Sequence, residues 1–134
     1  MSSPVFHHVS VITRDLEHAK TFYRDVLGLT EVERPPFPHP GAWLRSGPLE
    51  IHITYYLGGS FRSGPVDPND THFAIRVPDF EAAVADLARK GYVDSGEPTN
   101  PRRIVIKRDN VTGYPQLWIM DHDRNVIEIN ASSL

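Results

Sequence analysis

Four polar side chains occupy matching positions in a pattern that the chain contains twice. His8 opens the phrase HVSVITRDLEHA and His72 opens HFAIRVPDFEAA; each half later holds an apolar–polar–apolar triplet, centred on His52 and on Glu128. Three imidazoles and one carboxylate suit Zn, Ni, Co, Mn or Fe(II), whereas Ca and Mg prefer shells of oxygen alone. The repeat therefore predicts one divalent metal site with His8, His52, His72 and Glu128 as its ligands.

This ligand set predicts a particular chemistry. An octahedral ion held by four side chains keeps two adjacent positions, which a substrate with two neighbouring oxygens could fill. The metal would act as a Lewis acid that stabilises an enolate or a developing alkoxide. Because a carboxylate bound through one oxygen keeps a basic one, Glu128 could also carry a proton. Glu128 and His52 are therefore the candidate catalytic residues.

Two other ligand sets remain open. His8, His72 and Glu128 alone would form the triad of two histidines and one carboxylate that Fe(II) oxygenases use, with His52 as a nearby acid or base. Alternatively, Glu50 lies two residues from His52 on the same strand face and could replace it as a ligand.

Composition and charge narrow the classes of protein. A length of 134 residues suits one domain, and a net charge of −3 gives no basic surface for nucleic acid. Because the sequence contains no cysteine, thiolate ligands and disulfides are excluded. Neither a signal peptide pattern nor a membrane span is visible, so we expect a cytoplasmic protein that binds neither nucleic acid nor a membrane.

The spacing of apolar residues predicts the elements of the first half. A strand at 5–13 should precede a helix that Asp15 caps and Gly28 ends. Three further strands are expected at 29–33, 42–45 and 49–55.

The second half repeats this order after a linker, about 58–70, that is rich in Gly, Ser and Pro. A strand at 72–77 should precede a helix between Asp79 and Gly91. The later strands are expected at 117–120 and 126–130, with 93–95 and 103–108 as alternatives for the remaining one. Each half then has the order β-α-β-β-β, which predicts an α+β fold of two modules, about 4–57 and 71–134.

Alternation along the strands puts the candidate ligands on one face of each expected sheet. His8 shares its face with Ser10, and His72 shares its face with Ala74 and Arg76. The opposite faces are apolar and can bury the helices. Arg76 could meet an anionic substrate or be solvated, and Trp43 is expected to pack.

These phrases resemble the vicinal oxygen chelate superfamily, which includes glyoxalase I, extradiol dioxygenases and bleomycin-resistance proteins. The resemblance rests on HHVSVITRDLEHAKTFYRDVLGL, THFAIRVPDFEAAVADLARKG and DHDRNVIEIN, and covers essentially the whole chain. It implies two βαβββ modules in a cupped mixed sheet around one divalent metal, with the helices on the outer face, and a frequent homodimer, sometimes with exchanged modules. His8, His72 and Glu128 match the family's ligands, whereas His52 departs from a position that is Glu or Gln in some members.

The sequence thus predicts a metal-dependent enzyme that acts on a small, oxygen-rich molecule as a lyase, isomerase or transferase. An Fe(II) dioxygenase of the extradiol type is the first alternative. The second is a metal-free protein that binds a drug or metabolite, as the bleomycin-resistance branch does. That branch is expected to lack the ligands, whereas this chain has His or Glu at all four positions.

Overall fold

The computed structural model describes residues 3–58 and 62–134. The chain divides into two compact units, Met1–Ser60 and Phe61–Leu134, and each is considered by itself. None of the helices among the described residues is long and apolar enough to span a membrane.

Unit 1 (Met1–Ser60) is a four-stranded mixed sheet covered by a helix. The strand order is β1-β4-β3-β2, with β1 parallel to β4 and the other neighbours antiparallel. Its elements are β1 (His8–Thr13), α1 (Leu16–Thr21), a π-helical turn η1 (Phe22–Val26), β2 (Thr30–Val32), β3 (Gly41–Ser46) and β4 (Leu49–Tyr55). The predicted order β-α-β-β-β is confirmed.

Local chemistry explains the helix of unit 1. The Asp15 side chain accepts a hydrogen bond from the backbone N–H of His18 at 3.0 Å, as an N-cap residue should. Gly28 follows the helix with a φ of 76°, a left-handed conformation that glycine adopts without strain. Between them the helix widens into η1, which the apolar spacing does not predict. Ala19, Phe22 and Tyr23 are buried there.

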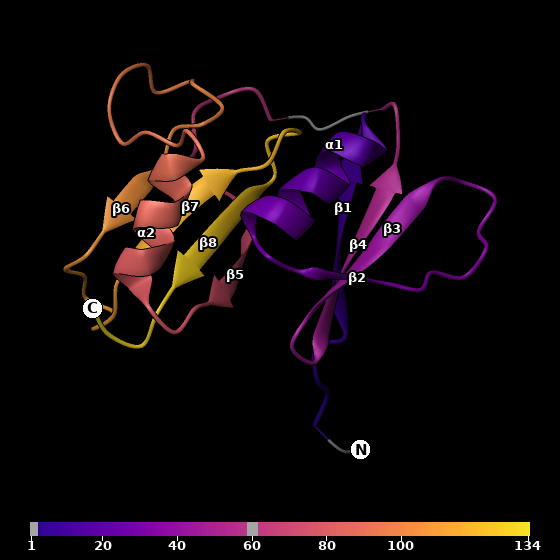
Figure 1. The fold of residues 1–134 in the computed structure, drawn as a ribbon, viewed down its shortest axis with the longest axis horizontal. Coiled ribbons are helices and arrows are strands. Elements are labelled where there is room, and N and C mark those ends of the chain that lie inside the picture. Colours follow the sequence, from indigo (N-terminus) through magenta and orange to yellow (C-terminus); the bar gives the residue numbers. More distant parts are fainter. Residues whose placement is uncertain (1–2, 59–61) are drawn as a thin grey trace. The chain divides into compact units, whose positions relative to one another are not determined.

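Unit 2 (Phe61–Leu134) repeats the architecture. The strand order is β5-β8-β7-β6, with β5 parallel to β8. Its elements are β5 (His72–Arg76), α2 (Phe80–Arg89), β6 (Val105–Lys107), β7 (Gln116–Met120) and β8 (Val126–Asn130). The Asp79 side chain caps α2 by accepting from the N–H of Ala82 at 3.0 Å. In each unit the helix lies across its own sheet (Figure 1).

The remaining strand of unit 2, for which the sequence offers two alternatives, lies after residue 103. The strand is β6, within the 103–108 alternative. The 93–95 alternative contributes a single parallel bridge from Val93 to Arg103.

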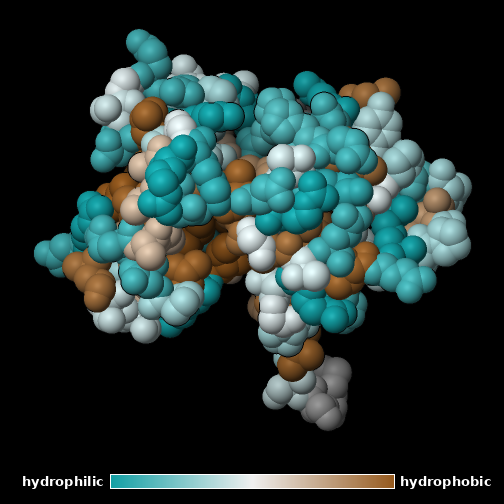
Figure 2. Space-filling view, in the orientation of Figure 1, coloured by the Kyte–Doolittle hydropathy of each residue, from teal (hydrophilic) through white to brown (hydrophobic). Residues whose placement is uncertain are grey.

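The first strand is shorter than expected. It begins at His8, and Val5 and Phe6 ahead of it are 88% and 83% exposed. The space-filling view shows hydrophobic atoms near the N-terminal end of the chain, whereas hydrophilic residues cover much of the visible surface elsewhere (Figure 2).

Candidate metal-binding site

Strand pairing gives the four candidate ligands equivalent backbone positions. In unit 1, β1 and β4 align so that Ser10 lies beside His52, two residues after His8. In unit 2, β5 and β8 align so that Ala74 lies beside Glu128, two residues after His72. Partners in register share a sheet face, so each unit presents its own pair of candidates on one face.

The pair in unit 2 brings two hydrogen-bond acceptors together. His72 Nδ1 lies 2.8 Å from the backbone oxygen of Asp70, which can only accept, so Nδ1 carries the proton and donates. In the neutral ring Nε2 then has a lone pair, and it lies 3.2 Å from Oε1 of Glu128. Two lone pairs at this distance repel unless a proton or a metal cation lies between them. The geometry therefore fits a cation ligated by both side chains.

The other oxygen of Glu128 is fully engaged. Oε2 accepts from Nε2 of Gln116 at 3.1 Å and from Nδ2 of Asn130 at 2.7 Å, and Glu128 is only 6% exposed. The side-chain amide of Asn110 in turn donates to the Gln116 oxygen, which fixes the orientation of that amide. These contacts hold the carboxylate in one rotamer. The proton-carrying role expected of Glu128 stays a prediction, and the oxygen that would carry the proton already accepts two hydrogen bonds.

The pair in unit 1 is arranged differently. The imidazole of His52 is stacked between two rings, with centroids 4.0 Å from His8 at an interplanar angle of 15° and 3.9 Å from Trp43 at 2°. Imidazole lone pairs lie in the ring plane, so two nearly parallel rings direct their nitrogens side by side rather than at one point. His8 and His52 are thus together, but at least one ring must turn before both can bind one ion.

Glu50 is the polar partner of His52. Nε2 of His52 donates to Oε1 of Glu50 at 2.9 Å, and Arg45 donates to Oε2 at 3.1 Å. These hydrogen bonds hold the pKa of Glu50 below its usual value, and the one from His52 has the larger effect. The contact also puts the proton of His52 on Nε2, which leaves Nδ1 with a lone pair for a metal.

His8 keeps its neutral, ligand-competent form readily. Partial desolvation lowers the pKa of its ring, and repulsion by charged forms of His52 and His7 lowers it further, against a smaller opposite effect of Glu50. Nδ1 of His7 lies 2.9 Å from Nδ1 of His8. Among the described residues, no group of three or more His, Cys, Asp or Glu side chains gathers in metal-binding range. Each unit, as far as it is described, supplies two of the four candidate ligands.

Comparison with known proteins gives the family. The family model for the Glyoxalase/Bleomycin resistance protein/Dioxygenase superfamily matches residues 5–129. This chain belongs to that superfamily. Among curated relatives of this glyoxalase superfamily protein, methylmalonyl-CoA epimerase of Mus musculus is 36% identical over 102 residues, which are 66% of this chain and 57% of the relative. Glutathione transferase FosA of Serratia marcescens is 25% identical over 130 residues, 96% and 81% of the two chains.

The chain spans little more than half the length of the mammalian epimerases that it matches, between 52% and 57%. Solved structures with the same fold include a glyoxalase family protein from Bacillus anthracis, with a TM-score of 0.76 and 20% identity over 98% of this chain and 97% of the other. Lactoylglutathione lyase from Agrobacterium tumefaciens has a TM-score of 0.69 and 18% identity over 98% and 96%. At these identities the likeness shows the fold, the α+β arrangement of two βαβββ modules that the sequence predicts.

The sequence predicts that Trp43 packs, and in the structure of this glyoxalase-like chain its partner is His52. Trp43 lies opposite His52, and Trp118 lies opposite Glu128, so each half places an indole beside its candidate ligand. The buried Nε1 of Trp118 has no hydrogen-bond partner among the described residues. The hydrogen bonds from Gln116 and Asn130 to Glu128 are not predicted by the sequence. The positions of these two residues along their strands predict the sheet face on which they lie, but not a hydrogen bond.

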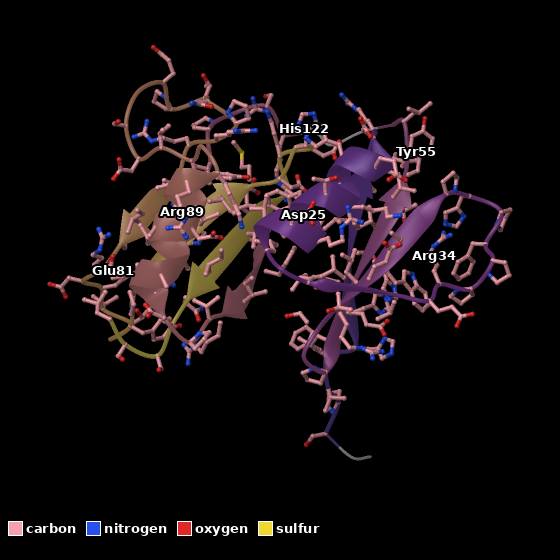
Figure 3. The ribbon with its side chains drawn as sticks, in the orientation of Figure 1. Asp25, Arg34, Tyr55, Glu81, Arg89 and His122 are labelled. Carbon is pink, nitrogen blue, oxygen red and sulfur yellow. The ribbon has the colours of Figure 1, made fainter. Side chains whose placement is uncertain are left out.

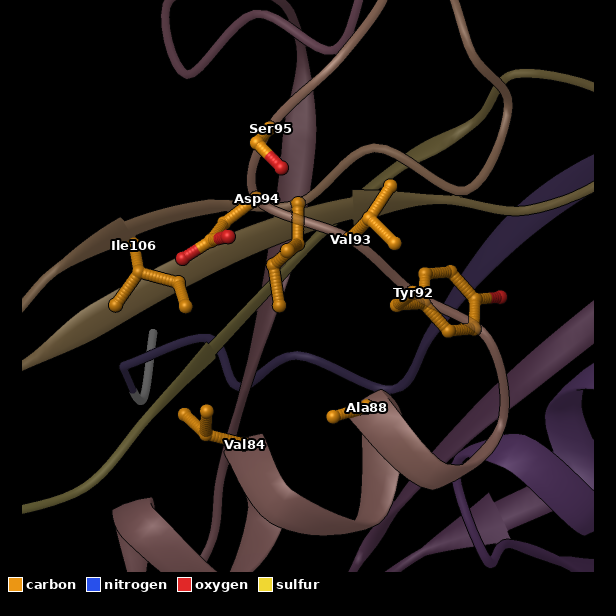
Figure 4. A pocket seen from close by; sticks show the side chains of 8 residues that line it. Val84, Ala88, Tyr92, Val93, Asp94, Ser95 and Ile106 are labelled. Carbon is orange, nitrogen blue, oxygen red and sulfur yellow. The ribbon is translucent and has the colours of Figure 1, made fainter.

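A cavity in unit 2 lies apart from the candidate ligands. It has a volume of about 210 Å³ and is lined by α2 and the segment that follows it, including Val84, Tyr92 and Ile106 (Figure 4). None of the four candidate ligands lines it.

Proposed function

We propose that this chain is a metal-dependent enzyme that acts on a small, oxygen-rich substrate as a lyase, isomerase or transferase. His8, His52, His72 and Glu128 are the proposed ligands of one divalent ion, of the Zn, Ni, Co, Mn or Fe(II) type. The observation that carries the proposal is the contact of 3.2 Å between Nε2 of His72 and Oε1 of Glu128, two groups that repel each other unless a proton or a metal cation lies between them.

The proposal assigns one pair of ligands to each unit. The duplicated strand register supports this assignment, because the His8–His52 and His72–Glu128 pairs hold equivalent positions. One chain could supply both pairs, or the chains of a homodimer with exchanged modules could share them.

The proposed chemistry divides between the ion and the chain. A bound divalent ion supplies Lewis-acid chemistry to a substrate that offers two neighbouring oxygens. Glu128 acts as a fixed ligand, because Gln116 and Asn130 hold its second oxygen. Proton transfer falls to His52 where it stays outside the metal shell: its Nε2–H is held by the Glu50 carboxylate, which orients the ring and leaves Nδ1 to act as the acid or base.

The epimerase among the relatives supports an enzyme that moves protons. An epimerase, by its name, inverts a carbon centre, and for the acidic carbon beside a carbonyl this means taking a proton and returning it. Methylmalonyl-CoA in D₂O is therefore a direct probe of the isomerase alternative. Loss of its α-proton signal in the NMR spectrum, dependent on protein and metal, is the expected result, and no exchange would remove that alternative.

A second candidate function is an Fe(II) dioxygenase with His8, His72 and Glu128 as the ligand triad. The stacking of His52 between His8 and Trp43 favours it, because a stacked His52 is not directed at an ion shared with His8. Oxygen consumption by the Fe(II)-loaded protein with catechol as probe would support this function. Its absence, together with metal binding, would favour the first one.

Metal analysis of the purified protein tests the proposal. We expect bound divalent metal in the wild type, weaker binding in His52→Ala, and wild-type binding in His122→Ala, whose ring lies in the turn between β7 and β8 (Figure 3). Unchanged stoichiometry and affinity in His52→Ala would contradict the four-ligand site and leave the triad. A wild type that binds none of these metals would contradict the proposed function.

A further inference from the structure

Arg76, at the end of β5, is a positively charged side chain on the sheet face of the proposed ligands. The register partner of Arg76 on β8 is Asn130, two residues beyond Glu128. On β5, Arg76 lies four residues beyond His72. Both spacings are even, so all four side chains share one face of the unit 2 sheet.

Two neighbours fix the guanidinium of Arg76. Its Nε donates to Oδ1 of Asn130 at 2.9 Å, and its central carbon lies 4.8 Å from the centroid of the Tyr114 ring. A planar guanidinium held at Nε and on one face keeps its two terminal nitrogens as donors, in a fork that matches a carboxylate or phosphate. Holding the fork in place beforehand lowers the entropy cost of binding.

The charge of Arg76 is not neutralised within the described part of the chain. Other arginines of the chain pair with carboxylates: Arg45 with Glu50, Arg89 with Asp86 and Arg108 with Glu81. No ion pair of Arg76 is found among the described residues. Lys107, whose register partner is Gln116, adds a second cation to the same face of unit 2, 5.6 Å from the Trp118 ring.

Asn130 joins Arg76 to the proposed metal ligand. Its Oδ1 accepts from Arg76 while its Nδ2 donates to Glu128, so the orientation of the amide is fixed by both partners. An anion held by the fork therefore lies one side chain away from the carboxylate of Glu128. This separation suits a substrate that has a few atoms between its chelating oxygens and a charged group.

We infer that Arg76 is a specificity-determining residue that binds an anionic group, a carboxylate or phosphate, on the far end of the substrate. The inference deepens the proposed function and rests on it. It narrows the substrate class from oxygen-rich molecules in general to those that carry a negative charge beyond the two oxygens presented to the metal.

The first test compares two metal-chelating probes by calorimetry on the Mn²⁺-loaded protein. Acetohydroxamate offers two chelating oxygens only, whereas the monohydroxamate of succinic acid adds one carboxylate. We expect Arg76→Gln to lower the affinity for the carboxylate-bearing probe about tenfold or more, because this probe makes a charge-assisted hydrogen bond to Arg76. The affinity for acetohydroxamate, which makes no such bond, should fall less than about twofold. Arg89→Gln, on the exposed surface of α2 (Figure 3), should change neither.

Equal weakening of both probes in Arg76→Gln would overturn the inference, because Arg76 would then act only through Asn130 on the metal ligand. Unchanged affinity for both probes would overturn it as well. Mn²⁺ alone should bind Arg76→Gln as it binds the wild type, so a loss of metal affinity in this variant would also count against it.

A second test needs no metal and separates the two proposals. Inorganic phosphate is titrated into the metal-free protein, and the side-chain Nε–H signals of the arginines are followed by NMR. We expect a saturable shift of the Arg76 signal, which Arg76→Gln identifies by its loss, and no such shift for Arg89. If the wild type binds no metal but Arg76 responds, the proposed function fails and the anion site stands. If Arg76 does not respond, the anion site is contradicted whatever the metal does.

Discussion

The two units carry equivalent pairs of candidate ligands in different states. In unit 2, His72 and Glu128 face each other, and neighbouring groups fix both: Asp70 for the ring, Gln116 and Asn130 for the carboxylate. In unit 1, by contrast, His8 and His52 are stacked. Duplication has thus copied the strand register but not the side-chain contacts.

The difference predicts an order of events. The unit 2 pair needs no rearrangement to accept a cation, whereas a ring of unit 1 must leave a stack. Aromatic pairs contribute about 0.5–1.5 kcal/mol beyond the area they bury, and His52 has two such neighbours. Unit 2 is therefore the half that should bind metal first, with unit 1 completing the shell.

Among the substitutions that compare the two units, replacing the first-strand histidine of unit 2 should have the largest effect. His72→Ala removes one of the two facing acceptors, so we expect metal affinity to fall by more than about 100-fold, beyond the range usual for outer-shell partners. Calorimetric titration measures it. His8→Ala is the matched variant in unit 1, and a smaller loss there would sharpen the difference between the pairs. Wild-type affinity in His72→Ala would break the comparison.

Removing a support of Glu128 should have an intermediate effect. Asn130→Ala deletes the donor 2.7 Å from Oε2, so we expect metal affinity to fall about tenfold, as for other outer-shell partners. Thr54 holds the equivalent position of unit 1, beside the unit 1 candidates His8 and His52, and Thr54→Ala should change the affinity little. Equal effects of the two substitutions would argue that unit 2 is no better preorganised than unit 1.

The contact between His52 and Glu50 should have a smaller effect. In Glu50→Gln a neutral oxygen still accepts from Nε2 of His52, so we expect metal affinity to fall only about threefold if His52 is a ligand. Unchanged affinity would make His52 an acid or base outside the shell. A loss as large as that of His72→Ala would instead make Glu50 itself the ligand.

The last prediction concerns stability rather than metal binding, and it lies in the segment after the helix, which is much longer in unit 2. It carries Tyr92, and burial raises the pKa of its phenol from 10.0 to about 12, with the charge of Arg102 opposing and that of Asp121 adding to the shift. The unfolded chain ionises first, so this stabilisation is present below pH 10.0 and is lost as the pH rises to about 12.

Absorbance at 295 nm should resolve one tyrosine that ionises near pH 12, and Tyr92→Phe should remove that step while making Tm less sensitive to alkali. A set of tyrosines that all ionise near their ordinary pKa would show that this segment leaves Tyr92 in water.

The sequence was sufficient for those features that depend on local chemistry and strand phase. The caps Asp15 and Asp79, the last strand Val126–Asn130 and the order of elements follow from spacing alone. The π-helical turn at Phe22–Val26 does not, because helical spacing fits both helix types at short length. The stacking of Trp43 on His52 and the amide contacts of Glu128 also escaped, since they depend on rotamers of residues distant in sequence.

The number of metal ions bound per chain tests the central claim most directly, namely that the two pairs are halves of one site. Calorimetric titration of the wild type with Mn²⁺ should give one ion per chain, and Glu128→Gln should abolish that binding. Two ions per chain in the wild type, or one ion retained in Glu128→Gln, would contradict the account.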